Sequence, residues 1–229
     1  MSPVNSPNKV FLPGTGLAAS MYNRLDVSQN STCIDIDQMS NFDTCVTSIA
    51  NQIPDASVIT GYSMGARIAA NIAIKYPQKT SGLVLVSFNA GLNENERDSR
   101  KLHDEKLATL AKQNLAKMYE TFDENNVFDT YIDLDEYRLK DPAVVAWQLN
   151  ELGLGSSSNI EEQLMEIRVP VLYITGIRDS KYVTLNQKYK KKTAFSFHMK
   201  LDSDHRVPFA CPNVLSSNIE WFISNVVNG

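Results

Sequence analysis

Residues 57–69 read S-V-I-T-G-Y-S-M-G-A-R-I-A, and this segment leaves few folds open to the chain. A short β-branched run leads into the pattern Gly-x-Ser-x-Gly, and small and aliphatic residues at helical spacing follow it. This order is typical of a nucleophile elbow, in which a strand ends, the chain turns sharply, and a helix begins after the serine. Gly61 and Gly65 suit the turn because a side chain at either position would collide with the neighbouring strand or helix. The segment therefore predicts that Ser63 is held above a sheet.

Strand and helix patterns alternate on both sides of the elbow. Apolar runs predict strands at 9–12, 32–37, 57–62, 83–88, 169–176 and 196–201. Apolar spacing predicts helices at about 18–25, from Phe42 to Ile53, after the elbow, and at the end of the chain, where Leu215, Ile219, Phe222 and Val226 share a face. Such an alternation predicts an α/β fold with a mostly parallel sheet and right-handed crossovers.

A charged, helical stretch without strand-like runs interrupts this alternation between about residues 90 and 165. Leu115, Met118, Tyr119 and Phe122 form one apolar stripe within it, and the run 144–152 forms another. Strands resume after it, so we interpret residues 1–229 as one domain with a helical lid inserted at 90–165.

Composition excludes several other classes of protein. The net charge of −4 does not favour a nucleic-acid or membrane-surface partner. The three cysteines show no metal-ligand spacing, and their odd number argues against a disulfide framework. No apolar run approaches the length of a membrane span, and the first residues do not read as a signal peptide. We therefore expect a cytoplasmic protein that contacts neither membrane nor nucleic acid.

Candidate catalytic residues follow the predicted strands. Ser63, Asp179 and His205 come in the chain order of the triads in α/β hydrolases. A serine hydroxyl needs an imidazole within hydrogen-bond reach to accept its proton, and a carboxylate to orient that imidazole. Asp179 comes just after an apolar strand, and His205 is the one histidine predicted in a loop between the last strand and the last helix. The other acids near His205, Asp202 and Asp204, are too close in sequence to face its ring easily.

An oxyanion hole is predicted beside Ser63. Its donors would be the N–H of Met64 and one N–H from the first glycine loop, from Thr15 or Gly16.

The same first loop also supports a different class of function. Residues 14–19 read G-T-G-L-A-A after a strand, and Asp35 follows at about the spacing of a ribose-binding acid. A nicotinamide-dependent oxidoreductase is therefore an alternative, although Pro13 precedes the first glycine and Ser63, Asp179 and His205 stay unexplained by it. A further alternative is a binding module of the hydrolase fold without catalysis.

Two stretches go beyond the generic pattern. The run 61–69, with the later Y-P at 76–77 and L-V-L-V-S at 83–87, resembles the elbow of the 2-succinyl-6-hydroxy-2,4-cyclohexadiene-1-carboxylate synthases of menaquinone biosynthesis. The run 175–182, T-G-I-R-D-S-K-Y, is similar to the G-x-R-D-x-K-[FY] acid motif of that family. The resemblance implies an α/β-hydrolase fold.

The resemblance also implies an elimination instead of a hydrolysis. In that family the triad serine removes a proton, the ring rearranges, and pyruvate leaves without a metal or an organic cofactor. Arg67 and a lid arginine would bind substrate carboxylates, the lid residue being Arg100 or, failing that, Arg97. Tyr62 and Lys181, which lie in the matching motifs, are further candidates for substrate binding. A small anionic substrate fits guanidinium groups placed in a protein that is acidic overall.

The chain departs from the family at three places. The first loop reads L-P-G-T-G where the family has His-Gly, the histidine loop reads S-D-H where Gly-His is usual, and serines replace the aromatic residue and Gln-Pro expected after Gly155. An ester or thioester hydrolase, such as a carboxylesterase or a pimeloyl-carrier methyl esterase, is therefore the second interpretation within the same fold.

Overall fold

The centre of the computed structural model is a six-stranded sheet in the order β2-β1-β3-β4-β5-β6. Every pair of neighbouring strands is parallel. The structure describes residues 7–26, 30–126, 130 and 140–229. The strands are β1 Lys9–Leu12, β2 Ser31–Cys33, β3 Ser57–Tyr62, β4 Thr80–Val86, β5 Val171–Gly176 and β6 Ser196–Leu201. The predicted α/β class with a parallel sheet is confirmed.

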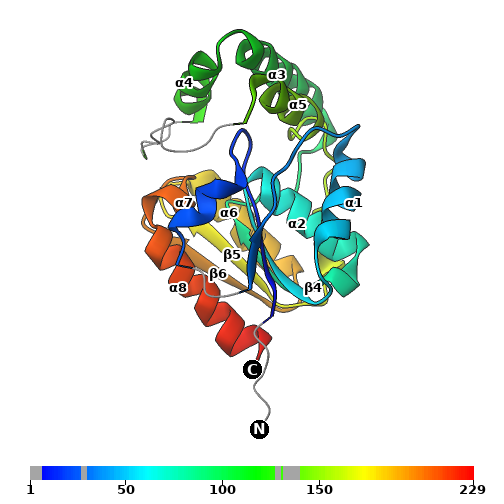
Figure 1. Ribbon diagram of the computed structural model, residues 1–229, viewed down its shortest axis with the longest axis vertical. Helices are drawn as coiled ribbons and strands as arrows, with labels where there is room; N and C mark the ends of the chain where they lie inside the picture. Colours follow the sequence, from blue (N-terminus) through cyan, green and yellow to red (C-terminus); the bar gives the residue numbers. More distant parts are fainter. Residues whose placement is uncertain (1–6, 27–29, 127–129, 131–139) are drawn as a thin grey trace.

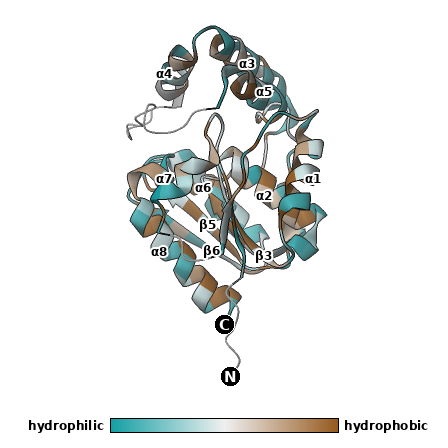
Figure 2. Cartoon of the chain, in the orientation of Figure 1, coloured by the Kyte–Doolittle hydropathy of each residue, from teal (hydrophilic) through white to brown (hydrophobic). Residues whose placement is uncertain are grey.

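Helices cover both faces of this sheet (Figure 1). The α-helices are α1 Phe42–Gln52, α2 Met64–Lys75, α3 Glu94–Gln113, α4 Leu115–Asn126, α5 Pro142–Glu151, α6 Ser180–Lys192, α7 Val207–Ala210 and α8 Pro212–Phe222. Short 3-10 helices span Ala19–Arg24, Pro77–Lys79 and Glu162–Glu166, and a π-helix spans Ile223–Val227. Figure 2 shows hydrophilic and hydrophobic residues alternating along α1 and α8, as expected of helices with one face on the core.

Alternate residues of each strand enter two separate cores, because successive side chains of a strand point to opposite faces. Leu83 and Leu85 of β4 join the core beneath α1, α2 and α6, whereas Val84 and Val86 join the core beneath α8. Both sides of the strand are therefore dry, which explains the continuous apolar runs of the sequence.

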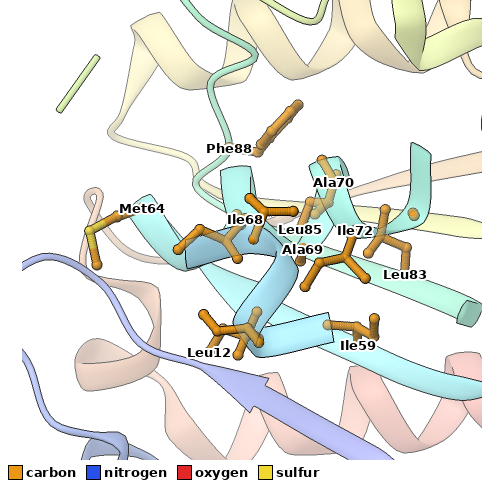
Figure 3. Packing of buried hydrophobic residues seen from close by; sticks show 14 of the residues in the cluster. Leu12, Ile59, Met64, Ile68, Ala69, Ala70, Ile72, Leu83, Leu85 and Phe88 are labelled. Atoms are coloured by element: carbon orange, nitrogen blue, oxygen red, sulfur yellow. The ribbon is translucent and has the colours of Figure 1, made fainter. Parts of the chain in front are cut away.

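Helix α2 lies close to the sheet because its inner face carries small residues. Ala69 and Ala70 are fully buried between Ile68 and Ile72, and they pack against strand residues of β1, β3 and β4 (Figure 3). This close packing fixes the N-terminal end of α2, and with it the residue that precedes the helix.

Helices α3, α4 and α5 lie together beyond the carboxyl ends of the strands (Figure 1). Their facing sides form a hydrophobic cluster of their own, which includes Leu107, Ala111, Met118, Tyr119, Val145 and Leu149. The stripe predicted over 115–122 packs into this cluster. Within the expected lid range of 90–165, residues 127–129 and 131–139 lie outside the described residues. We call α3, α4 and α5 the lid helices.

Three element predictions needed correction. The strand expected at 32–37 is β2, Ser31–Cys33, because the chain leaves the sheet after Cys33 and places Ile34 and Ile36 in the core. The helix expected at 18–25 is a 3-10 helix over Ala19–Arg24. The strand expected at 83–88 is β4, Thr80–Val86.

Within the described ranges, no helix is both long enough and apolar enough to cross a membrane.

Candidate active site

Ser63 lies on the turn between β3 and α2, in a backbone conformation that side chains rarely adopt, with φ 52° and ψ −107°. Its N–H donates to the carbonyl of Val86 at 2.9 Å, which ties the turn to the end of β4. A side chain on Gly61 would place its Cβ 2.4 Å from the Gly65 carbonyl oxygen, and one on Gly65 would place it 2.3 Å from that of Leu12. Only glycine therefore allows this turn to form between the packed strand and helix.

This close approach makes Gly65→Ala a strongly destabilising substitution. The new methyl group would meet backbone atoms of Leu12 and Pro13, neither of which can swing aside as a side chain can. We expect the free energy of unfolding to fall by about 3 kcal/mol or more, the upper end of the overpacking range. Urea unfolding followed by circular dichroism measures this, with Ser99→Ala at an exposed position of α3 as the control. A loss under about 1 kcal/mol would contradict the packing described for the elbow.

The structure brings Ser63, His205 and Asp179 into one hydrogen-bonded row. His205 Nε2 lies 3.2 Å from Ser63 Oγ, and His205 Nδ1 lies 2.8 Å from Asp179 Oδ2. A carboxylate only accepts, so Nδ1–H donates to Asp179 and the Nε2 lone pair is left to accept the Ser63 hydroxyl proton. Asp179 is itself held as the N-cap of α6, where its Oδ1 accepts the N–H of Tyr182 at 3.3 Å. This arrangement can take a proton from the serine and share the resulting positive charge.

Two tyrosines support the His205 ring. The ring of Tyr182 meets it edge-on, with centroids 4.5 Å apart, and burial raises the pKa of the Tyr182 phenol. Tyr62 lies 5.8 Å from His205 and 6.2 Å from Phe209, measured between ring centroids. Tyr62 is 5 % exposed and is not among the residues lining the cavity at Ser63. The expectation that Tyr62 binds substrate is therefore corrected: it is a packing residue beneath the histidine.

Of the two candidate donors in the first loop, the structure leaves one. The N–H of Gly16 donates to the side-chain oxygen of Gln148 at 2.7 Å, so it cannot also serve an oxyanion. Among the described residues, nothing accepts a hydrogen bond from the N–H of Thr15 or of Met64. Thr15 also lines the cavity with Ser63. The expectation for Gly16 is corrected, and Met64 and Thr15 remain the candidate oxyanion hole.

A cavity of about 480 Å³ opens above Ser63. Its walls come from the loops after the strands and from the lid helices, which supply Phe122 and Leu149. Ligands of open α/β sheets bind at the carboxyl ends of the strands, and this cavity lies there. Four of its lining residues are cationic side chains: Arg67, Arg100, Arg178 and Lys181. Three acidic side chains, Asp104, Asp179 and Asp204, line it as well.

Arg67 is the most deeply placed of these cations, at 6 % exposure. Its guanidinium donates to Ser157 Oγ and to the Leu152 carbonyl oxygen, each at 2.5 Å. No carboxylate of the described residues forms an ion pair with it. Burial lowers the pKa of Arg67 to about 10, which leaves the group charged at neutral pH. A buried charge with only neutral partners is costly, and a ligand carboxylate would offset that cost.

The lid arginines separate into one inside the cavity and one outside. Arg100 lines the cavity, where its Nε donates to Asp104 Oδ1 at 2.8 Å. Arg97 lines a different surface hollow together with Glu94 and Lys101, so its expected role in substrate binding is corrected. Lys181 is exposed and also lines the cavity, and its role in substrate binding stays a prediction.

Sequence reasoning did not single out three polar residues of the cavity. Asn89 and Tyr182 line the cavity together, and the Asn89 side chain partly opposes the rise in the pKa of the Tyr182 phenol. Asp104 is 1 % exposed and also accepts the N–H of Gly155 at 3.4 Å. Tyr182 could have been found from the sequence, because it fills the aromatic position at the end of the acid motif. Nothing in the sequence distinguishes Asn89 from other asparagines that follow a strand, or Asp104 from the other acids of the lid.

The dinucleotide alternative loses both of its features. The chain after Gly16 enters a short 3-10 helix, so the α-helix that would follow the glycines in a dinucleotide-binding unit does not form. Asp35 accepts the N–H of Ala19 at 2.8 Å and pairs with Lys140, also at 2.8 Å. In the described part of the chain, no three His, Cys, Asp or Glu side chains gather closely enough to ligate one metal ion.

Comparison with known proteins agrees with this geometry. Residues 28–193 match the family model Hydrolase_4, described as serine aminopeptidase, S33. MenH from S. aureus superposes with a TM-score of 0.88 at 21 % identity, over 100 % of this chain and 97 % of that one. The fold is that of the α/β hydrolases, as expected.

Among curated proteins, the chain is 30 % identical over 180 residues to one of Bacillus subtilis (strain 168) that carries the provisional name 2-succinyl-6-hydroxy-2,4-cyclohexadiene-1-carboxylate synthase. It is also 31 % identical over 94 residues to a pimeloyl-[acyl-carrier protein] methyl ester esterase of Wigglesworthia glossinidia brevipalpis. These matches cover 73 % and 36 % of this chain, and 66 % and 36 % of the two relatives. The resemblance to the synthases is confirmed.

Proposed function

Because the chain belongs to the serine aminopeptidase S33 family of α/β-hydrolase-fold proteins, we propose that Ser63, His205 and Asp179 are its catalytic triad. We propose further that it is a lyase of menaquinone biosynthesis, which eliminates pyruvate from a succinyl-cyclohexene carboxylate. The similarity to the curated synthase relatives supports this choice of reaction.

The observation that carries the proposal is the buried guanidinium of Arg67 in the cavity of Ser63. An ordinary esterase has no need of a desolvated cation whose hydrogen-bond partners are neutral, because its acyl substrates are uncharged there. A substrate with several carboxylates would pair with Arg67 and would approach Arg100 and Lys181 as well. The cationic side chains of the cavity, Arg67 above all, thus favour a polyanionic substrate.

The row of hydrogen bonds supports a base role for the serine. His205 Nε2 would take the hydroxyl proton of Ser63 while Ser63 Oγ takes a proton from a ring carbon of the substrate. The electron pair left on the ring forms a new double bond, and the carbon–oxygen bond to the leaving group breaks to release the enolate of pyruvate. That enolate takes up the proton held by His205 and becomes pyruvate, which returns the histidine to its neutral form. Where negative charge develops on a substrate oxygen, the N–H groups of Met64 and Thr15 would stabilise it. No covalent enzyme intermediate is needed.

The direct test supplies the purified protein with the succinyl-cyclohexene carboxylate and follows pyruvate with lactate dehydrogenase. Hydrolysis of neutral p-nitrophenyl esters is measured beside it. We expect pyruvate release to have the larger kcat/KM. Ester hydrolysis without pyruvate release would refute the proposed reaction and leave the triad in place.

The two lid arginines form a matched pair for a second prediction. Arg100→Ala should lower kcat/KM for pyruvate release about tenfold or more, because Arg100 lines the cavity and Arg97 does not. Arg97→Ala, three residues earlier on the same helix, should leave it within about twofold. Steady-state kinetics of both variants at one ionic strength measures the difference. Equal losses in the two variants would contradict a substrate contact made by Arg100 and not by Arg97.

The second candidate is a carboxylic ester or thioester hydrolase. The similarity to a pimeloyl-[acyl-carrier protein] methyl ester esterase favours it, since that relative is named for ester cleavage. Ser63 would then attack the ester carbonyl, and the same two N–H groups would stabilise the tetrahedral oxyanion.

A further inference from the structure

One lid side chain bridges the two loops that follow β1 and β2. Gln148 of α5 is fully buried, and both ends of its amide are hydrogen-bonded. Its oxygen accepts the N–H of Gly16 at 2.7 Å, and its nitrogen donates to the Ile36 carbonyl oxygen at 2.8 Å. An amide has no free rotation left once it is held at both ends, so its contact with Gly16 is fixed.

The lid also holds the other side of Gly16. The carbonyl oxygen of Gly16 accepts the hydroxyl of Tyr119 and the backbone N–H of Lys140, each at 3.0 Å. Gly16 adopts a φ of 78°, and a Cβ there would lie 2.0 Å from the Tyr119 hydroxyl oxygen. The two glycines give the loop G-T-G great conformational freedom, and its contacts with the lid remove that freedom.

We infer that Gln148 is a positioning residue for the oxyanion hole. By binding the N–H of Gly16 it orients the Thr15–Gly16 peptide, and this leaves the preceding peptide to present the N–H of Thr15 beside Ser63. Preorganised donors stabilise a developing oxyanion because they need not reorient during the reaction. The lid thus builds part of the catalytic machinery in addition to covering it.

This inference rests on the proposed triad chemistry of Ser63, but it does not depend on the choice between elimination and ester hydrolysis. Both reactions place negative charge on an oxygen near Met64 and Thr15. A test should therefore report on the hole itself, separately from the natural substrate.

Phenylboronic acid provides such a probe. Ser63 Oγ adds to boron as its proton passes to His205, and the tetrahedral boronate that forms places an oxygen in the hole. Succinate serves as the comparison ligand, because its carboxylates are bound by the cavity cations without a covalent bond. The variant Gln148→Met has a similar volume and lacks both hydrogen bonds. The control is Gln163→Met at an exposed position.

We expect Gln148→Met to weaken phenylboronic acid about tenfold or more, somewhat less than the loss of a whole oxyanion donor, and to leave succinate affinity within about threefold. In turnover, kcat should fall while KM changes little. If Gln148→Met fails to fold, Tyr119→Phe is the second variant. It removes only the hydroxyl that binds Gly16 of the same loop, and it should weaken phenylboronic acid by a smaller factor.

Equal weakening of both ligands, or of neither, would overturn the inference. Failure of phenylboronic acid to bind the unaltered protein would overturn it too, because no formed hole would exist for Gln148 to hold. If Gln148→Met weakens phenylboronic acid but not succinate, and the unaltered protein releases no pyruvate, the proposed lyase reaction is refuted and this inference stands.

Discussion

Replacing Ser63 with alanine is expected to lower kcat for pyruvate release by at least about 10³-fold, because the triad residues act as a unit and the hydroxyl is the group that touches the substrate. The fold should persist, since the alanine Cβ occupies the same place on the turn and the backbone bond from residue 63 to Val86 is kept. Stopped-flow or long-time assays with the purified variant measure the residual rate.

A matched control is Ser99→Ala, which removes an exposed hydroxyl from the lid helix α3. It should retain the activity of the unaltered protein. If Ser63→Ala kept more than about a tenth of the activity while its melting temperature was unchanged, Ser63 would not be the catalytic base or nucleophile.

The second large effect concerns Arg67→Met. Removing the guanidinium should cost about 2–5 kcal/mol against a polycarboxylate substrate, which is a loss of about 30-fold to several thousand-fold in kcat/KM. Turnover of a neutral ester should change little, because Arg67 is not part of the row from Ser63 to Asp179. Kinetics with both substrates on one protein preparation gives the comparison.

Stability supplies an independent check on the same variant. Methionine leaves Ser157 and the Leu152 carbonyl without the guanidinium, which destabilises, but it also removes a buried charge, which stabilises. We therefore expect a smaller change in the free energy of unfolding than in transition-state binding. The exposed Arg168→Met is the control. Equal losses on the anionic and the neutral substrate would identify Arg67 as structural and would favour the esterase interpretation.

The elbow could be predicted from a local pattern, and the meeting of Ser63, Asp179 and His205 from the general geometry of parallel sheets. Gly61 and Gly65 mark the turn by their spacing alone, and the carboxyl ends of parallel strands come to one edge of a sheet whatever the loops do. The catalytic roles of the three residues remain predictions.

The errors arose where contacts between distant segments decide the outcome. Gly16 was expected to donate to an oxyanion, but a glutamine from the lid, far along the chain, takes its N–H. Tyr62 and Arg97 sit in suggestive motifs, yet one packs under His205 and the other faces a different hollow. Spacing along a sequence does not say which face of a helix or strand meets a cavity formed by several elements.

The position of the lid in the chain bears on how the protein folds. Strands β4 and β5 are neighbours in the sheet, yet the chain runs from Val86 through all three lid helices before it returns at Val171. Closing so long a connection costs chain entropy before the strands gain any contacts. Pairings between residues distant in sequence therefore slow folding. Ser63 lies on the segment before this gap, whereas Asp179 and His205 lie after it. We therefore expect β4 to pair with β5 late in folding and the catalytic row to form only then. The return of activity during refolding should follow that step and lag behind the recovery of helix.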